Sequence, residues 1–176
     1  TLLGARLLLG RPLGEFGDAL VEPLDALGRP GAELGGRVAD ARSPTDRLRL
    51  LHETVAERLL SAAPIAPGLI FAFRRLNRAG VRIADLAREV GMSRERLSKA
   101  FRREFGLTPK TFARIRRFVR TLDARERAPA LNGAALAATC GYVDQAHMIR
   151  EFQDLAGSAP AGLWRRALPD AGGFVD

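Results

Sequence analysis

Hydrophobic residues return every three or four positions along most of this chain, which is the spacing of one face of an α-helix. In the segment 44–61 the apolar positions at this spacing are Leu48, Leu51, Val55 and Leu59. Ser43 can cap this helix and Pro44 suits its first position, so the sequence marks the start as well as the face. The pattern predicts an amphipathic helix over 44–61.

The same spacing predicts helices in the rest of the chain. They are expected at about 15–27, 31–41, 68–79, 83–90, 94–105, 109–127, 133–140 and 144–156, with a last one that begins at Pro160. Gly80 is expected to cap the helix that starts at Gly68. No segment alternates polar and apolar residues as a half-buried strand does, so the predicted fold class is all-α.

A segment of small residues and prolines, SAAPIAPG at 61–68, divides the chain. Before it lies a helical region, 1–66, which is rich in Gly, Leu and Pro at its start and makes a poor core by itself. After it lies the region 67–176, whose helical pattern is more regular. The sequence therefore predicts two parts with a linker between them.

The sequence LAREVGMSRERLSKAF at 86–101 has the spacing of a helix-turn-helix. Ala87 is small where two helices would cross, Gly91 tolerates the positive φ of a tight turn, and Ser93 can cap the second helix. Leu97 then falls on the inner face of that helix. Each interval has a mechanical reason, and together they predict two short helices packed at a steep angle.

A second copy of this pattern follows fifty residues later, with one extra residue in its turn. The matching pairs are Ala87 with Ala137, Gly91 with Gly141, Ser93 with Asp144, Leu97 with Met148, and Phe101 with Phe152. Both copies end in Gly-x-x-Pro, where a new helix is expected to begin. Two helix-turn-helix units are therefore predicted, at about 83–105 and about 133–156.

The predicted helix 109–127 joins the two units. At ~1.5 Å per residue it would span roughly 28 Å, and one turn of B-DNA is about 34 Å. A rod of that length can hold two recognition helices in successive major grooves on one face of a duplex. Between Arg94 and Arg127 the chain carries 12 basic and 4 acidic residues, which suits such a partner.

The positive charge of the chain is concentrated after the linker. The net charge is +8, but residues 1–66 hold 8 basic and 9 acidic residues whereas residues 67–176 hold 20 and 11. This asymmetry favours contact with a polyanion in the second part. The alternative is a solubilising surface of a protein from an arginine-rich proteome.

The sequence gives little support to other chemistry. Cys140 has no second cysteine to pair with, and it lies too far from His52 and His147 for a usual zinc site. No Gly-rich phosphate loop, nucleophile–base pair or carboxylate cluster is found, so no enzyme, metal or cofactor is expected. No membrane span or signal segment is recognised, and a cytoplasmic protein is expected.

The two units together resemble the AraC/XylS family of bacterial transcription regulators. The resemblance covers about residues 68–167, through LAREVGMSRERLSKAFRREFGLTPKTFARIRRF and LAATCGYVDQAHMIREFQDLAGSAPAGLWRR. The second unit reads Gly-Tyr-x-Asp-Gln-Ala-His, like one branch of that family, while its ending at Leu163-Trp164-Arg165 is shifted by one residue from the usual pattern. Residues 1–66 resemble the tail of a preceding N-terminal domain. The resemblance implies duplex DNA as the partner, and RNA polymerase and a second copy bound through the N-terminal part are further candidate partners.

Helical geometry selects the residues of each unit that would face DNA. In the first unit Glu95, Ser98 and Lys99 share one exposed face and match the base-contacting positions of the family. The alternative for Glu95 and Lys99 is a surface ion pair one turn apart. In the second unit the expected base readers are Gln145, His147 and Arg150, and His147 is equally consistent with a helix-surface histidine of no special role.

The remaining basic residues divide between phosphate contacts and internal ion pairs. The expected phosphate contacts are Arg94, Arg96, Arg102, Arg103, Lys110 and Arg116. Internal ion pairs are the alternative for Arg114, Arg117 and Arg120, for example between Arg120 and Asp123. The residues expected in the core are Phe112, Ile115, Val119, Leu122, Cys140 and Trp164.

The leading hypothesis is a sequence-specific, double-stranded DNA-binding transcription regulator. A non-specific architectural DNA binder could use the same basic surface. A DNA-repair alkyl acceptor would need an accessible, reactive cysteine, and Cys140 lies between Thr139 and Gly141 with no basic neighbour. A fourth hypothesis makes residues 1–66 a module that binds another protein.

Overall fold

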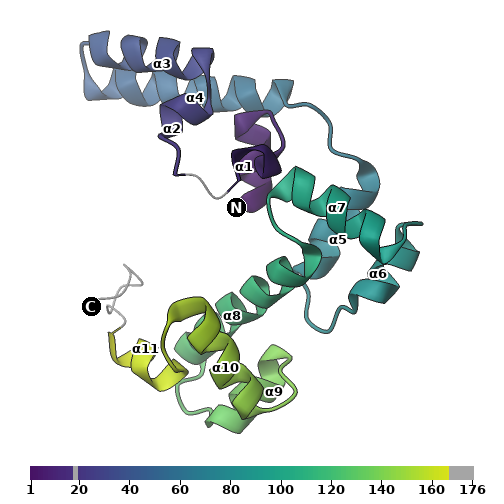
Figure 1. Ribbon diagram of the computed structural model, residues 1–176. Helices are drawn as coiled ribbons and strands as arrows, with labels where there is room; N and C mark the ends of the chain where they lie inside the picture. Colours follow the sequence, from purple (N-terminus) through teal and green to yellow (C-terminus); the bar gives the residue numbers. More distant parts are fainter. Residues whose placement is uncertain (18–19, 167–176) are drawn as a thin grey trace. The chain divides into compact units, whose positions relative to one another are not determined.

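The structure is a computed structural model that describes residues 1–17 and 20–166. These residues form helices and no strands, so the predicted all-α class is confirmed. The first helices are α1 (Leu2–Leu9), the 3₁₀ helix η1 (Leu13–Phe16), α2 (Pro23–Ala26), α3 (Arg29–Asp40) and α4 (Pro44–Ser61). They are followed by α5 (Pro67–Leu76), α6 (Ile83–Glu89), α7 (Arg94–Phe105), α8 (Pro109–Arg127), α9 (Gly133–Cys140), α10 (Gln145–Ala156) and α11 (Pro160–Arg166), as drawn in Figure 1.

Most predicted helix boundaries agree with the structure because a capping residue marks them in the sequence. The hydroxyl of Ser43 accepts a hydrogen bond from the backbone N–H of Asp46, at 3.1 Å, and Pro44 is the first residue of α4. The side chain of Asn132 caps α9 in the same way. Where the sequence offers a cap and a proline or glycine at the two ends, local chemistry is enough to place a helix.

Two of the predicted helices differ from the observed ones. The segment expected to be one helix over 15–27 contains η1 and α2, which are separate short elements. The helix that starts near Gly68 ends at Leu76, so Gly80 is not its C-cap. Gly80 instead adopts a φ of 72° within the turn that follows. A glycine with positive φ serves a turn as well as a helix end, and the sequence alone does not separate the two.

The chain forms two compact units, and each is described by itself. The first consists of residues 1–72 and 87–109. In it α3 packs along α4 as a helical hairpin, α2 packs on α3, and both α1 and η1 pack on α7 (Figure 1). Its most deeply buried side chains include Leu97, Phe101 and Phe105 of α7, and the rings of Phe101 and Phe105 lie 4.6 Å apart. The core of this unit therefore lies against α7.

The apolar face of α4 is largely exposed within this unit. Leu48 has 69% of its surface accessible, and Leu51, Val55 and Leu59 have 41–45%. The amphipathic helix is thus present as predicted, but α1 and α3 do not cover its apolar face. The sequence identifies an apolar face on a helix, but it does not tell what covers that face.

The second unit consists of residues 73–86 and 110–176, of which 73–86 and 110–166 are described. Its core contains Leu136, Ala137, Cys140, Tyr142, Met148, Phe152 and Leu163. Helix α8 contributes Phe118 and Leu122 to this core, and the ring of Phe118 lies 4.5 Å from that of Phe152. The core therefore joins α8 to the three helices that follow it.

The buried face of α8 is displaced from the predicted one. Phe112 is buried and stacks on Phe73 at 4.9 Å, as expected for a core residue. Ile115 and Val119 are only half-buried, whereas Phe118 contacts the core and Thr121 is completely buried. Thr121 satisfies its hydroxyl by donating to the carbonyl of Arg117, at 2.9 Å, which is why a polar side chain is tolerated there.

No described helix is both long enough and apolar enough to cross a lipid bilayer.

Candidate nucleic-acid interface

The first helix-turn-helix is formed by α6, a short turn and α7. Ala87 is 1% exposed, and Gly91 adopts a φ of 66° in the turn, a conformation that costs glycine little. The hydroxyl of Ser93 accepts a hydrogen bond from the backbone N–H of Arg96, at 3.1 Å, and so caps α7. Leu97 is fully buried. Each of these residues has the role that its spacing predicts.

The second helix-turn-helix repeats this construction with α9 and α10. Ala137 is fully buried, and Gly141 has a φ of 83°. The carboxylate of Asp144 accepts a hydrogen bond from the backbone N–H of His147, at 2.6 Å, as the N-cap of α10. Met148 takes the place of Leu97 and is 1% exposed. The repeat found in the sequence is therefore also a repeat of local structure.

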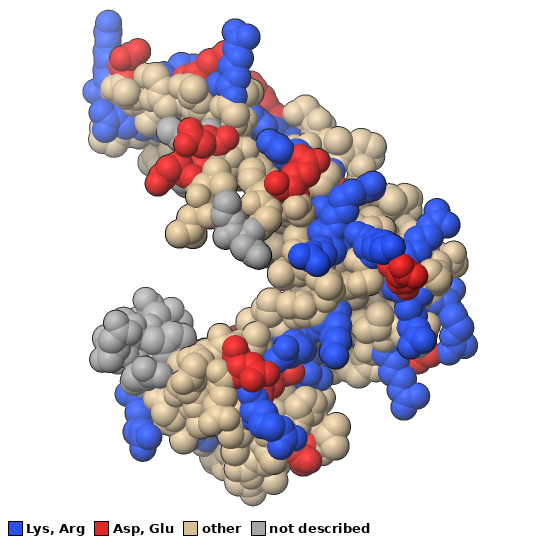
Figure 2. All heavy atoms as spheres, in the orientation of Figure 1, with Lys and Arg blue, Asp and Glu red and all other residues tan. Residues whose placement is uncertain are grey.

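The outward face of α7 is basic and open to solvent. Its exposed residues include Arg94, Glu95, Arg96, Lys99, Arg102 and Arg103, and Ser98 is half-buried between them. On the face drawn in Figure 2, Lys and Arg side chains gather over the region of α7 and α6. A helix that presents six such charged residues, five of them basic, has the surface that duplex DNA requires.

Two of the expected base readers on α7 form an ion pair with each other. The ammonium of Lys99 lies 2.7 Å from a carboxylate oxygen of Glu95, and both side chains are more than three-quarters exposed. An exposed pair of this kind stabilises a helix by only ~0.3–0.5 kcal/mol. The pair therefore contributes little to holding either side chain in place.

A hollow of about 660 Å³ lies beside α7 within the first unit. Its lining includes Arg96, Lys99 and Arg103, which are spaced so that they follow one side of the helix. The N-cap Ser93 and the apolar residues Leu69 and Met92 line the rest of it, together with Ala66, Glu95 and Ala100. Three basic side chains therefore lie along one side of an open hollow.

The predicted base readers of α10 differ in how they are placed. Arg150 is exposed. The amide of Gln145 lies over Gly133, where an added Cβ would be only 2.5 Å from its Nε2 atom. The imidazole of His147 meets the ring of Tyr142 edge-on at 5.4 Å, and its Nε2 atom lies 3.9 Å from Glu151. Gln145 and Arg150 are thus both exposed, whereas His147 is half-buried.

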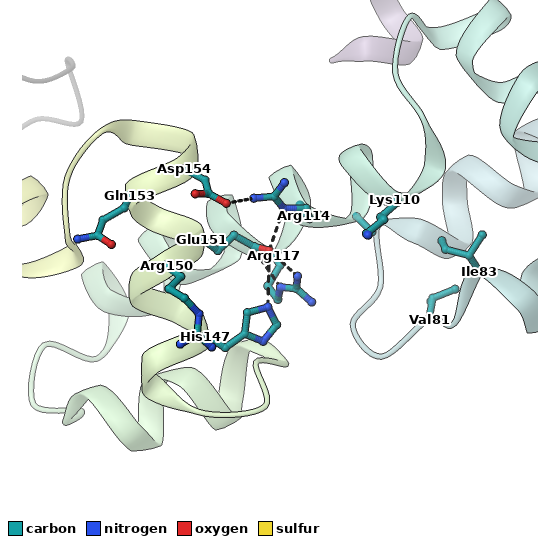
Figure 3. Close-up of a pocket in the computed structure, with 11 residues that line it drawn as sticks. Val81, Ile83, Lys110, Arg114, Arg117, His147, Arg150, Glu151, Gln153 and Asp154 are labelled. Atoms are coloured by element: carbon teal, nitrogen blue, oxygen red, sulfur yellow. Dashed lines mark hydrogen bonds and ion pairs between the residues drawn. The ribbon is translucent and has the colours of Figure 1, made fainter.

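A pocket of about 580 Å³ lies in the second unit and is lined by residues of α8 and α10 and by Val81 and Ile83. Figure 3 shows the lining side chains. The lining includes Lys110, Arg150 and His147, all predicted to contact DNA. Arg114 and Arg117 also line it, but both are tied to acidic residues of α10. Part of the positive charge in this pocket is therefore neutralised inside the protein.

Glu151 is the acidic residue at the centre of this arrangement, and the sequence did not single it out. It is 3% exposed and accepts hydrogen bonds from Nε of Arg114 at 3.1 Å and from Nε and Nη2 of Arg117 at 2.9 and 2.7 Å (Figure 3). Arg114 also donates to the exposed Asp154 at 2.8 Å. Ion pairing, one of the two alternatives for Arg114 and Arg117, is thus what the structure contains. An acidic residue beside Phe152, on the inward face of a predicted helix, was the available signal.

The charge of Glu151 is stabilised by its arginine partners. Burial acts to raise the pKa of this carboxyl, but the hydrogen bonds and charges of Arg117 and Arg114 outweigh it and hold the pKa below its ordinary value. The same contact with Glu151 raises the pKa of Arg117, which also lies over the ring of Tyr142 at 4.8 Å. Burial raises the pKa of Tyr142 to about 12. Glu151 and Arg117 are therefore both charged at neutral pH, and Tyr142 stays protonated.

The other arginines of α8 are less completely satisfied. Arg120 donates to the carbonyl of Asn77 at 3.2 Å, which is a different contact from the suggested pair with Asp123. Burial, together with the nearby charges of Arg116 and Arg117, lowers the pKa of Arg120. The Nε atom of Arg116 is buried without a hydrogen-bond partner in the structure, so part of this predicted phosphate contact is turned inward.

Cys140 and Trp164 lie where the sequence placed them, in the core of the second unit. Cys140 is 2% exposed, and its sulfur lies 3.8 Å from the carbonyl oxygen of Arg120. Trp164 meets Phe152 edge-on and is covered by the guanidinium of Arg125 at 4.9 Å. A buried thiol is a poor acceptor of an alkyl group, so the position of Cys140 disfavours the repair hypothesis. Among the described residues, no cluster of His, Cys, Asp and Glu could hold a metal ion.

The structure therefore contains two capped helix-turn-helix units, and the outward face of the first recognition-type helix, α7, is basic. The family model of a helix-turn-helix domain matches residues 86–166, which include both α7 and α10. Residues 86–166 form a helix-turn-helix domain of the AraC type, a class of DNA-binding domains that regulate transcription. The comparisons with curated proteins and with solved structures found no match.

Proposed function

We propose that this protein is a sequence-specific regulator of transcription that reads double-stranded DNA with α7 and α10. The observation that carries the proposal is the repeat: each of the two helices is capped by a side-chain oxygen, buries an apolar residue at the matching position and exposes polar residues on the opposite face. A recognition helix reads the major groove with such a face. Two of them in one chain suit two successive segments of groove.

In the first unit, Glu95, Ser98 and Lys99 are proposed to contact base edges. Lysine can donate to O6 and N7 of guanine, and glutamate can accept from N4 of cytosine. The exposure of Glu95 and Lys99 supports this role, because neither side chain is held by the protein except through their mutual pair. In the second unit, Arg150 is proposed to read guanine and Gln145 adenine, with His147 beside them.

Phosphate contacts are proposed for the basic residues that flank these readers. They are Arg94, Arg96, Arg102, Arg103, Lys110 and Arg116. The hollow lined by Arg96, Lys99 and Arg103 supports this assignment for the first unit. Such contacts position the protein on the duplex without carrying sequence information.

The length of α8 supports the proposed spacing of the two readers. The helix is continuous over 19 residues, from Pro109 to Arg127. At ~1.5 Å per residue this is about 28 Å, which approaches the about 34 Å between successive major grooves on one face of DNA. We propose residues 67–176 as the DNA-binding part, with residues 1–66 as a region that adds other contacts.

A second copy of the chain is proposed to dock on the exposed apolar face of α4. Leu48, Leu51, Val55 and Leu59 recur there at helical spacing and are 41–69% exposed. Sedimentation of the wild type against a Leu51→Gln/Val55→Gln variant tests this, because only the wild type is expected to dimerise as its concentration rises. Identical monomer masses at all concentrations would contradict it. RNA polymerase, and the cytoplasm as the place of action, are proposed on the resemblance to bacterial regulators.

The experiment that tests the main proposal is selection of bound duplexes from a random library near physiological salt. An enriched motif with two elements about one helical turn apart is expected. A flat profile with retained binding would favour the alternative of a non-specific architectural DNA binder, which also needs a basic surface. Absence of any binding would contradict both.

Lys99→Ala then tests the assignment of a single reader. The variant is expected to bind the selected duplex about 1–3 kcal/mol more weakly and to lose base preference at one position. Arg29→Ala is the matched control, because Arg29 is an exposed arginine of α3 with a helical ion pair of its own to Glu33, at 2.9 Å. An equal loss on all sequences would make Lys99 a phosphate contact instead.

A further inference from the structure

The N-terminal segment of the chain packs on the first recognition helix, far from it in sequence. Within the first unit, α1 and η1 both contact α7 (Figure 1). The segment lies outside residues 86–166, which the family model matches. A contact between residues nearly a hundred positions apart is therefore part of the immediate support of α7.

A buried ion pair connects the two elements. Nε of Arg6 donates a hydrogen bond to a carboxylate oxygen of Glu104, and the two residues are 3% and 6% exposed. An ion removed from water in this way is costly unless its partner is present, so each of the two residues depends on the other. Glu104 lies in the last turn of α7, three residues after the fully buried Phe101.

The backbone of the segment comes equally close to the end of α7. A Cβ on Gly14 would lie 2.6 Å from the carbonyl oxygen of Arg102 and 2.7 Å from that of Arg103. Gly106, which ends α7 with a φ of 77°, has the backbone of Leu13 at 3.6 Å from the place of its own Cβ. Only a glycine at position 14 permits this approach, and it is made to the backbone rather than to any one side chain.

The two repeats differ at this point. By the alignment of the two units, Glu104 corresponds to Leu155 of α10. Leu155 is 37% exposed, whereas Glu104 is buried by α1 and η1. The first repeat thus carries a carboxylate where the second carries an aliphatic residue, and Arg6 accounts for the difference.

The segment leaves the proposed DNA-binding face of α7 free. Glu95, Lys99, Arg102 and Arg103 are exposed although α1 and η1 are in place. The contact is made with the C-terminal turns and the opposite side of the helix. An inhibitory segment would have to cover the reading face, so this arrangement supports the helix rather than blocking it.

We propose that residues 2–16 are a brace for the first recognition helix, with Arg6 and Glu104 as its positioning pair. The brace fixes the last turns of α7, while Ser93 fixes its first turn and Leu97 its middle. Base readout by α7 then depends on a segment that lies outside the helix-turn-helix domain. The DNA-binding consequence rests on the function proposed above, whereas the support of α7 does not.

The test compares Arg6→Met with Arg11→Met in the full chain. Arg6→Met keeps the length of the side chain but removes the charge that Glu104 needs. Arg11 is the matched control, because it lies in the same segment and its two recorded partners, the exposed Glu15 at 2.8 Å and the ring of Phe16 at 4.9 Å, also belong to that segment. The double variant Arg6→Met/Glu104→Met replaces the buried pair by two apolar side chains and is the rescue.

Two quantities are measured for each variant. Amide hydrogen exchange over residues 101–106 reports the last turns of α7 without any DNA. Arg6→Met is expected to speed this exchange about tenfold or more, and Arg11→Met is not. Affinity is then measured on the selected duplex and on a scrambled one. Arg6→Met is expected to weaken binding to the selected duplex about tenfold, with a smaller loss of affinity for the scrambled one. The double variant is expected to recover both the slow exchange and the affinity for the selected duplex.

Three outcomes would overturn the proposal. They are unchanged exchange in Arg6→Met, faster exchange with unchanged discrimination between the two duplexes, and tighter binding, which would make the segment an inhibitor. If Arg6→Met does not fold, Arg6→Lys keeps a charge at that position, and a smaller change in the same direction supports the brace. If the wild type selects no motif, the function proposed above fails, and the exchange experiment still decides whether residues 2–16 support α7.

Discussion

Glu151 stands where the first recognition helix has Ala100, and this single difference changes how the second unit is held together. The carboxylate receives three hydrogen bonds from two arginines of α8, so α10 is tied to α8 by charge as well as by the core. The guanidinium groups of Arg114 and Arg117 are engaged in these hydrogen bonds. At the residue scale, the same basic composition therefore serves two purposes, DNA binding on one face and internal cohesion on another.

Glu151→Gln is expected to lower the free energy of unfolding by about 2–3 kcal/mol at neutral pH, because charge-assisted hydrogen bonds to two arginines are lost or weakened. Urea denaturation measures the change. Asp154→Asn is the control, since Asp154 is 65% exposed at its side chain and pairs with Arg114 alone. If Glu151→Gln lowers the free energy of unfolding by less than Asp154→Asn does, Glu151 does not hold α10 to α8.

The same residue predicts a dependence on pH. The pKa of Glu151 is lower in the folded protein than its ordinary value of 4.5, so the native state binds fewer protons than the unfolded state near that pH. Its contribution to stability is present above the ordinary pKa and is lost as the pH falls through the folded one. The difference in unfolding free energy between wild type and Glu151→Gln is therefore expected to shrink in acid below pH 4.5. A constant difference down to the acid limit would contradict the pKa shift.

At the scale of elements, each helix-turn-helix depends on a turn that bends through a glycine with positive φ. Gly91 and Gly141 have φ values of 66° and 83°, and no other feature distinguishes the two turns as clearly from helix. Capping side chains then start the recognition helices. These local devices explain why α7 and α10 are so alike although their inward faces are lined by different residues.

Gly91→Ala is expected to destabilise the protein by about 1–2 kcal/mol, because a residue with a Cβ resists the left-handed region. Nothing lies within 4 Å of the place of this Cβ, so strain is the cause rather than a clash. Gly36→Ala in α3 is the matched control, because that site is equally open and is not among the glycines with positive φ. The control is expected to gain about 0.5–1 kcal/mol in thermal denaturation. Equal effects of the two changes would contradict this account.

At the scale of the whole molecule, the excess of basic residues after residue 66 is found on particular surfaces of the structure. Exposed basic residues line the outward face of α7, and Lys110 and Arg150 line the pocket beside α10. The region before residue 67 is close to neutral and carries instead an exposed apolar face on α4. Electrostatic attraction and apolar docking are thus assigned to different parts of the chain.

The salt dependence of DNA binding tests the number of phosphate contacts. If the six proposed contacts are made, the slope of log K against log salt is expected to be about −5, since each contact releases close to one counterion. Arg103→Ala is expected to make that slope less steep by about 1 and to weaken binding to all duplexes equally. A change confined to the selected duplex would instead make Arg103 a base reader.

The sequence by itself determined the elements and the repeat. Caps, prolines and positive-φ glycines are local devices, so α4, α7, α8, α9 and α10 have the boundaries that the sequence predicts to within a residue. The buried residues at the crossing of each helix pair also follow from spacing alone. These residues lie within the segment 86–166 that the helix-turn-helix family model matches.

Only the tertiary structure decided which charges pair and which faces are covered. Nothing local predicts that Arg6 meets Glu104, that Glu151 takes two arginines of α8, or that the apolar face of α4 stays open. These outcomes depend on which segments distant in sequence come together. Periodicity tells which side of a helix is apolar or charged, whereas the partner of that side is set by the packing of the whole unit.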